Sequence, residues 1–113
     1  IKGKIINYSM YRYQFSNEFF DIYGKFINYL KNVRKMDVVL VLTPFHQLSY
    51  DLTKKETSVF LELEEKFRAL SKREGVRIVG SYDPSKTKCK LTEFYDDLHP
   101  KGICMKRIVE NIK

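Results

Sequence analysis

The first long stretch of patterned sequence has apolar residues at helical spacing. Between residues 19 and 30 the apolar positions recur at steps of three and four. This spacing predicts an amphipathic helix of about 17 residues that ends near Arg34. Ser16 is the expected N-cap, and Glu18 places negative charge in the first turn, where it favours helix formation.

A second helix is predicted in the middle of the chain. Thr53 and Glu56 have the spacing of a capping box, in which two side chains satisfy the first backbone N–H groups of a helix. Apolar residues between 59 and 70 form one face, and most of the polar residues between them fall on the other. We therefore expect a helix from this box to about Arg73, ended by Gly75.

Two short apolar segments predict buried strands. Residues 38–42 are continuously apolar and mostly β-branched, as in strands buried on both faces of a parallel sheet, and Pro44 ends the segment. Residues 76–83 (VRIVGSYD) predict the second strand. Residues 45–52 (FHQLSYDL) and residues 83–92 are predicted to be loops.

The end of the chain predicts a third helix, over residues 100–112, with Pro100 at its first position, where proline is favoured. Its expected inward positions are Ile103, Ile108, Val109 and Ile112. Near the start of the chain, Ile5 and Ile6 give a weak strand signal.

Strands that alternate with helices predict an α/β fold, with a parallel sheet covered by helices on both faces. The length of 113 residues fits one domain, residues 1–113. Two clear strands are few for a sheet, and the sequence begins with Ile1 instead of Met. Either the first residues add a strand, or, as we expect, the chain is the C-terminal part of a larger α/β domain.

Composition and charge narrow the classes of function. The net charge of +7 arises from scattered Lys and Arg residues with acids among them, which indicates a solvated face more than a nucleic-acid site. The longest strongly apolar run, residues 38–42, is too short to cross a membrane, and no signal peptide is recognisable. Cys89 and Cys104 form neither a disulfide framework nor a CxxC site, and a single bridge between them stays open.

The candidate chemistry lies at the predicted carboxyl ends of the strands, where open α/β sheets bind ligands. Asp96 stands three residues before His99 in a predicted turn. In a turn, a carboxylate at this spacing can fold back and hydrogen-bond to the imidazole. This contact fixes the tautomer of the ring and prepares it to act as a general base. Asp97 is a competing partner. The alternatives are that Asp96 stabilises the start of the last helix and that His99 is an N-cap or turn histidine.

Residues 94–102 (FYDDLHPKG) resemble the C-terminal block of the SGNH/GDSL hydrolases, in which Asp-x-x-His is followed by a glycine and a closing helix. Asp96, His99 and Gly102 stand at the matching positions. Residues 37–51 also resemble the late strand and loop of extracytoplasmic members that act in polysaccharide or cell-wall O-acylation. The resemblance covers residues 37–113.

This resemblance implies a flavodoxin-like three-layer α/β/α sandwich and a serine nucleophile, with a glycine and an asparagine helping to form the oxyanion hole. The three blocks that carry those residues are not recognisable in the chain. Ser81 follows a strand and a glycine, but no helix is predicted directly after it, as a nucleophile turn requires. Ser49 and Ser9 have no better context. We therefore expect the serine to lie outside this chain, which alone should be inactive.

His46, in the other strand-end loop, is a candidate substrate-binding residue; the alternative is that it packs on Tyr50. Two histidines without a third ligand at a recognised spacing do not predict a metal site, and no cofactor motif is present.

The main hypothesis from the sequence is thus the C-terminal portion of an SGNH-type esterase or O-acyltransferase. Its substrate would be a small-molecule or glycan ester. The alternative is a non-enzymatic α/β module that binds an anionic partner through a basic surface. If further layers of the domain are absent, apolar residues of the first helix should be exposed and favour self-association.

Overall fold

The computed structural model describes residues 17–112 of the 113-residue chain. The predicted N-cap Ser16, the weak strand signal at residues 5–6 and Ser9 lie outside the described residues. The elements, in chain order, are α2 (Asn17–Asn28), the π-helical turn η2 (Tyr29–Val33), β1 (Val39–Leu42), α3 (Gln47–Glu56), α4 (Val59–Glu74), β2 (Arg77–Gly80), α5 (Pro84–Thr87), the 3-10 turn η3 (Leu91–Glu93) and α6 (Gly102–Val109).

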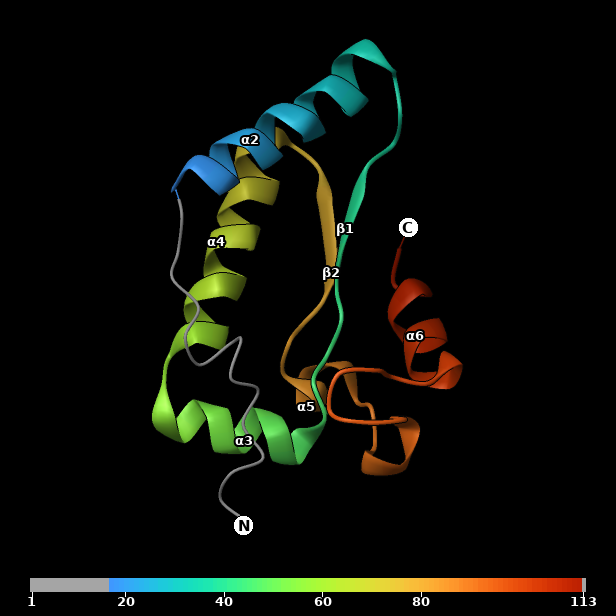
Figure 1. Cartoon of the computed structure of the whole chain (residues 1–113). Helices are drawn as coiled ribbons and strands as arrows, with labels where there is room; N and C mark the ends of the chain where they lie inside the picture. The colour runs from blue at the N-terminus through green and yellow to red at the C-terminus, as the bar shows by residue number, and fades with distance from the viewer. Residues whose placement is uncertain (1–16, 113) are drawn as a thin grey trace.

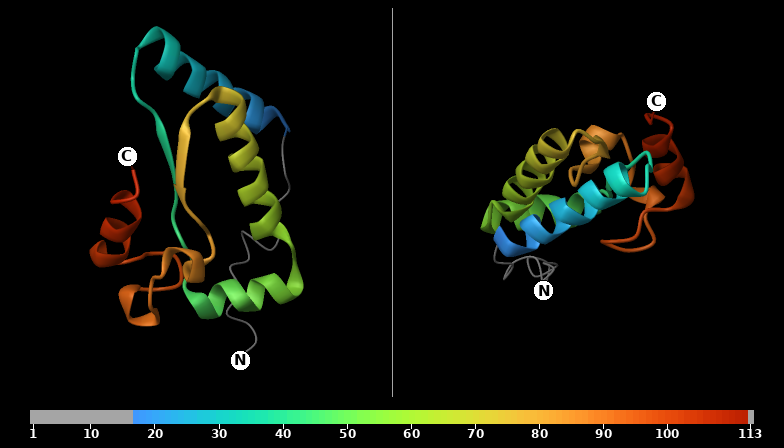
Figure 2. Two further views of the ribbon diagram at one scale, coloured as in Figure 1. Left: turned by 180° about the vertical axis from the view of Figure 1, so that it is seen from behind. Right: turned by 90° about the horizontal axis from the view of Figure 1, so that it is seen from above.

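The two predicted strands form a parallel pair, with Val39 opposite Arg77 and Leu42 opposite Gly80. Figures 1 and 2 show α4 and α6 on opposite sides of this pair. Successive strand residues point to opposite faces. Ile78 accordingly packs into the cluster shared with α2 and α4, whereas Val79 packs against the cluster of α6. The fold is therefore mixed α/β with a parallel sheet, as predicted.

Gly80 allows the backbones of β1 and β2 to approach closely at the carboxyl end of their pairing. Its φ is +85°, and a Cβ there would overlap the carbonyl oxygen of Leu42. A side chain at this position would push the strands apart just before the loops that carry the candidate site.

Helix α2 has two apolar faces. Phe20, Gly24 and Ile27 are buried, and α2 packs against α4. The other face of α2, continued by η2, leaves large apolar side chains exposed to between 43% and 67% of their surface: Phe19, Ile22 and Phe26 in α2, and Tyr29 and Val33 in η2. This exposed stripe is the surface on which the proposed self-association would act.

The prediction of a loop over residues 45–52 is wrong, because α3 begins at Gln47. The predicted capping box at Thr53 is also wrong. Thr53 lies inside α3 and is fully buried, and the next helix begins at Val59, whose N–H donates to Thr57 Oγ1 over 3.2 Å. The predicted end is confirmed: Gly75 adopts a left-handed conformation after α4.

The last helix is shorter than predicted. Pro100 does not start it; this residue forms an isolated antiparallel bridge with Phe94, and Lys101 is the N-cap. Of the expected inward positions Ile108 is buried, but Ile103 and Val109 are exposed. The predicted loop 83–92 contains the short helix α5 and the start of η3.

Among residues 17–112, none of the helices has the length and apolar character needed to cross a membrane.

Candidate active site

The segments that follow the two strands meet at the carboxyl end of the sheet. The backbone N–H of Phe45, after β1, donates to the carbonyl of Tyr82, after β2, over 3.0 Å. The N–H of His46 donates to the carbonyl of Asp97 over 2.9 Å. These two bonds place His46 beside the segment that carries Asp96 and His99, so the three predicted site residues belong to one region.

The structure brings Asp96 and His99 together. Nδ1 of His99 lies 2.7 Å from Oδ1 and 2.8 Å from Oδ2 of Asp96. Oδ1 also accepts the backbone N–H of Leu98 over 2.8 Å and that of His99 over 2.9 Å. The Leu98 N–H, followed by the His99 ring, holds the pKa of Asp96 below its ordinary value. Both side chains are more than half exposed, so the pair is open to solvent.

Two backbone bonds close the segment between residues 93 and 101 into a loop. The N–H of Tyr95 donates to the carbonyl of His99 over 2.8 Å, and the N–H of Lys101 donates to that of Glu93 over 2.7 Å. Asp96 lies at the exposed end of this loop, which keeps it within reach of His99. His99 is not the N-cap of α6, which removes that alternative, and its side chain is exposed at the end of a turn.

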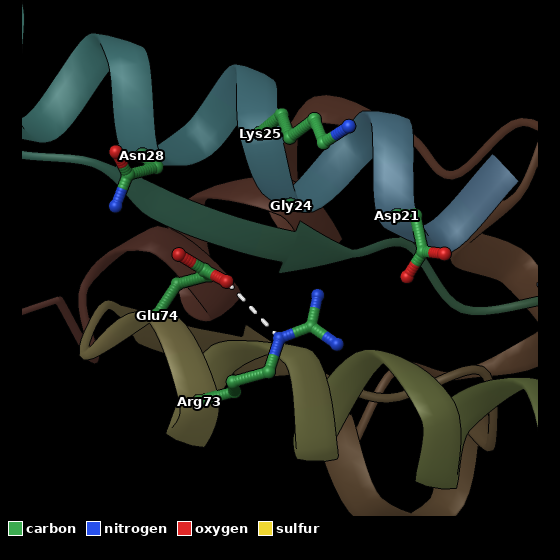
Figure 3. A pocket seen from close by; sticks show the side chains of 6 residues that line it. All are labelled: Asp21, Gly24, Lys25, Asn28, Arg73 and Glu74. Atoms are coloured by element: carbon green, nitrogen blue, oxygen red, sulfur yellow. Dashed lines mark hydrogen bonds and ion pairs between the residues drawn. The ribbon is translucent and has the colours of Figure 1, made fainter. Parts of the chain in front are cut away.

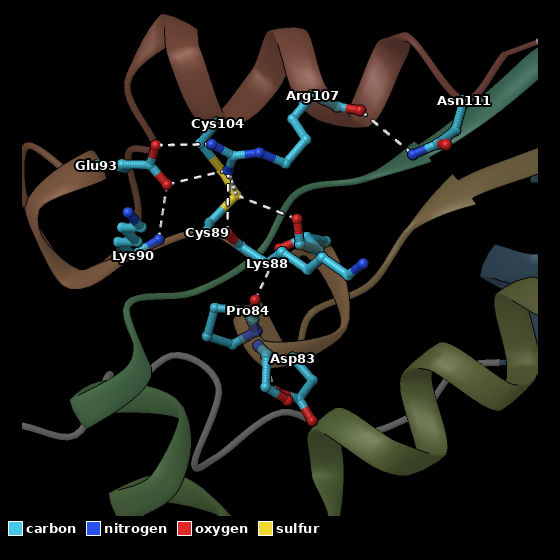
Figure 4. The surroundings of a disulfide bond; sticks show 11 residues. Asp83, Pro84, Lys88, Cys89, Lys90, Glu93, Cys104, Arg107 and Asn111 are labelled. Carbon is cyan, nitrogen blue, oxygen red and sulfur yellow. Dashed lines mark hydrogen bonds and ion pairs between the residues drawn. A yellow bond between two sulfur atoms is a disulfide. The ribbon is translucent and has the colours of Figure 1, made fainter.

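The base of the loop is cross-linked (Figure 4). A disulfide joins Cys89 to Cys104, with Cα atoms 5.4 Å apart. Beside it, Arg107 donates from Nη1 and Nη2 to the two carboxylate oxygens of Glu93 over 3.0 and 2.9 Å. Arg107, followed by the Lys90 backbone N–H, lowers the pKa of Glu93 to about 2. The sequence left the cysteine pairing open and gave no signal for this ion pair, whose partners are 14 residues apart.

A pocket of about 250 Å³ opens beside the Asp96–His99 pair. Its lining includes His46, Ser49, Tyr95, Asp96 and Asp97. Within residues 17–112, the ring of His46 makes no ring-to-ring contact with Tyr50, which stacks on Phe60. It contacts Phe94 edge-on, with ring centres 5.5 Å apart, and its Nδ1 caps α3 by accepting the Leu48 N–H over 3.2 Å.

Among the described residues, neither Ser81 nor Ser49 is hydrogen-bonded to His99. Ser81 is 2% exposed and donates its hydroxyl to Glu64 Oε1 over 2.7 Å, so it is sequestered at the end of β2. Ser49 lines the pocket, but its hydroxyl is buried. In residues 17–112, no serine hydroxyl is hydrogen-bonded to either nitrogen of His99.

Glu64 is one of the polar residues of α4, but it is buried. Burial raises the pKa of its carboxyl, while donation from Ser81, the Tyr82 backbone and Arg68 more than offsets this and lowers it overall. Its spacing of four residues from the buried Phe60 was the signal for this position. The role of Glu64 is structural: it ties α4 to the loop that follows β2.

Larger hollows lie between α2 and α4, away from the pair. One of about 400 Å³ is lined by Asp21, Lys25, Asn28, Arg73 and Glu74 (Figure 3). Arg73 donates to Glu74 over 3.0 Å there. No nucleophile–base arrangement is present among these side chains. In the described part of the chain, no group of three or more His, Cys, Asp or Glu side chains is placed to hold a metal ion.

Comparison of the chain with family models, with curated proteins and with solved structures gave no match. The case for a function therefore depends on the residues and their geometry.

Proposed function

We propose that the chain carries the base half of an SGNH-type serine esterase or O-acyltransferase. His99 would be the general base, and Asp96 the residue that orients it. A serine supplied by polypeptide outside the described residues would attack an acyl ester. The chain would then be the C-terminal part of a larger parallel α/β/α sandwich of the flavodoxin-like kind.

The observation that carries the proposal is the contact between Nδ1 of His99 and both carboxylate oxygens of Asp96. Because the lowered pKa keeps this carboxylate ionised near neutral pH, it can only accept hydrogen bonds. The proton of a neutral His99 ring must then be on Nδ1, and the lone pair of Nε2 is free to take a proton. A histidine held in this way is ready to act as a base.

The reaction would follow from this arrangement. The serine oxygen would bond to the acyl carbon while its proton passes to Nε2 of His99, and the alcohol would leave with that proton. Water or a second hydroxyl would then attack the acyl carbon and give its proton to Nε2 of His99, which would pass it to the serine oxygen as the bond between that oxygen and the acyl carbon breaks. Asp96 would stabilise the imidazolium that forms in both steps.

Two further features support the proposal. The pair follows the carboxyl end of β2, the edge at which open α/β sheets bind ligands. The disulfide is typical of proteins that fold in oxidising compartments, which agrees with the resemblance to extracytoplasmic members.

Labelling with a fluorophosphonate, which reacts with activated serines, tests the proposal. The protein that unites this chain with the serine should be labelled, and His99→Ala or Asp96→Asn should slow labelling by at least about a hundredfold. Asp83→Asn is the matched control, because this carboxylate lies in the same loop region and Asn also serves as an N-cap. Labelling that is unchanged in His99→Ala would refute the assignment of the base.

The alternative, a basic module for an anionic partner, has less support. Several cationic side chains are already engaged within the fold: Lys31 with the carbonyls of Glu74 and Gly75, and Arg68, Arg77 and Arg107 with carboxylates. Binding of that kind would weaken steeply with salt and would be unaffected by Asp96→Ala.

A further inference from the structure

The pocket beside the Asp96–His99 pair holds polar groups that the proposed base does not use. Besides Asp96, its lining includes His46, Ser49 and Asp97, with the aromatic residues Phe94 and Tyr95 among them. These groups come from the start of α3 and its N-cap, and from the loop between η3 and α6.

His46 presents a hydrogen-bond donor. Its Nδ1 accepts the Leu48 N–H, so this nitrogen carries no proton. In the neutral ring the proton is therefore on Nε2. Its own backbone N–H is held by the carbonyl of Asp97, and its ring rests edge-on against Phe94. These contacts fix the ring at the pocket and leave Nε2–H as its free polar group.

Ser49 has a hydroxyl without a partner. The residue is 1% exposed, and its Oγ makes no hydrogen bond in the structure. Buried hydroxyls are nearly always satisfied, so an unsatisfied one that borders a pocket points to a ligand or water that completes it. Thr53, the other buried hydroxyl without a partner among the described residues, does not line this pocket.

Asp97 adds an acceptor and a negative charge. Its backbone carbonyl accepts the His46 N–H, and no hydrogen bond or ion pair to its carboxylate is present among residues 17–112. With Asp96 it gives the pocket two carboxylates, which disfavour anionic ligands. The pocket thus offers a donor on His46, an acceptor on Asp97 and the unsatisfied hydroxyl of Ser49. Ligand hydroxyl groups can pair with all three, because a hydroxyl both donates and accepts hydrogen bonds.

We propose that this pocket binds a small uncharged hydroxylated group of the substrate, no larger than about one sugar ring. His46 Nε2 would donate to one ligand oxygen, the Asp97 carboxylate would accept from a hydroxyl, and Ser49 would complete its hydrogen bonding. At about 250 Å³ the pocket is below the usual range for drug-sized ligands, which argues against a long acyl chain. The inference depends on the proposed function, because it identifies this group as part of the ester substrate.

The test is a titration of the ¹⁵N-labelled chain with methyl α-D-glucopyranoside, followed through the imidazole signals and the amides of Leu48 and Asp97. We expect a saturable shift of the His46 Nε2 signal. His46→Ser removes the ring but keeps a good N-cap, and Asp97→Asn removes the charge. Each should weaken binding about two- to tenfold, as expected for the loss of one hydrogen bond. Sodium acetate at equal ionic strength should give no saturable shift.

Several outcomes would overturn the inference: no saturable shift with the glucoside, equal binding by a folded His46→Ser variant, or tighter binding of acetate. Amide spectra of each variant show whether it is folded. Because the exposed Glu65 on α4 does not line the pocket, Glu65→Gln should bind the glucoside as the unchanged chain does. Binding without serine labelling would refute the proposed enzyme and leave the pocket assignment standing.

Discussion

Arg107 holds Glu93 through two parallel hydrogen bonds, of 3.0 and 2.9 Å, directly beside the Cys89–Cys104 disulfide. Arg107 belongs to α6, and Glu93 starts the loop that carries Asp96 and His99. The ion pair and the disulfide therefore both tie the segment that leads into this loop to α6, the helix that follows the loop. Exposed catalytic loops need such supports, because the loop itself has little buried surface.

The ion pair predicts a dependence of stability on acid. The pKa of Glu93 is lowered from 4.5 to about 2 in the folded chain. A depressed folded pKa contributes stability above the unfolded pKa, and this contribution is lost as the pH falls toward the folded value. The advantage in Tm of the unchanged chain over Glu93→Gln should therefore be constant above about pH 5 and shrink between pH 4.5 and about 2.

Thermal unfolding followed by circular dichroism checks this, with the exposed Glu65→Gln as the control. A difference in Tm that stays constant down to pH 2 would show that Glu93 is not held as an ionised partner of Arg107.

The disulfide predicts a large effect on stability. It joins residues 15 apart in sequence, and a loop of this length corresponds to about 3 kcal/mol in the chain-entropy estimate. The double variant Cys89→Ser/Cys104→Ser should lose about this much free energy of unfolding, measured by urea denaturation without reductant. Adding a dithiol reductant should destabilise the unchanged chain by a similar amount and leave the double variant unaffected. Equal midpoints for both proteins would contradict the pairing.

Ser81 is predicted to be a structural residue. Its hydroxyl donates to the buried Glu64 carboxylate and accepts the Asp83 N–H over 3.1 Å. Ser81→Ala leaves both groups short of a partner and should cost about 1–3 kcal/mol of unfolding free energy, whereas the exposed Ser85→Ala should cost less. Urea denaturation compares the two. If Ser81→Ala is as stable as the unchanged chain but removes an esterase activity, Ser81 is a nucleophile.

His46 is predicted to stabilise α3 through its Nδ1. His46→Ala removes the cap and should lower the unfolding free energy by about 0.5–2 kcal/mol, whereas His46→Ser should retain most of it. Urea denaturation of the two variants separates capping from any role in binding. Equal stability of His46→Ala and His46→Ser would show that the cap contributes nothing measurable.

The sequence predicted the parts of the fold that local patterns determine. The apolar run of β1 and Gly75 after α4 gave correct elements, because strand burial and a left-handed helix end leave direct marks in sequence. Helix α3 was missed because residues 45–52 lack a clear apolar period and because an imidazole is not a usual N-cap. Thr53 gave a false start signal, since it faces the interior from inside α3.

For the candidate site, too, the sequence predicted the local contact and missed the contacts between distant segments. Asp96 and His99 are three residues apart, so a turn was enough to predict their contact. The Glu93–Arg107 pair depends on how α6 packs against η3, and the contact of His46 with Asp97 depends on how the start of α3 packs against the loop before α6. Such contacts between distant segments leave no mark in residue spacing.

The two histidines are expected to hold opposite tautomers, and this provides the most direct test of the account. Asp96 requires the proton of neutral His99 on Nδ1, whereas the Leu48 N–H requires that of neutral His46 on Nε2. A long-range ¹H–¹⁵N spectrum of the neutral rings identifies both. Asp96→Asn should release His99 from its tautomer and leave His46 unchanged. A His99 ring with its proton on Nε2 in the unchanged chain would contradict the claim that Asp96 prepares His99 to act as a base.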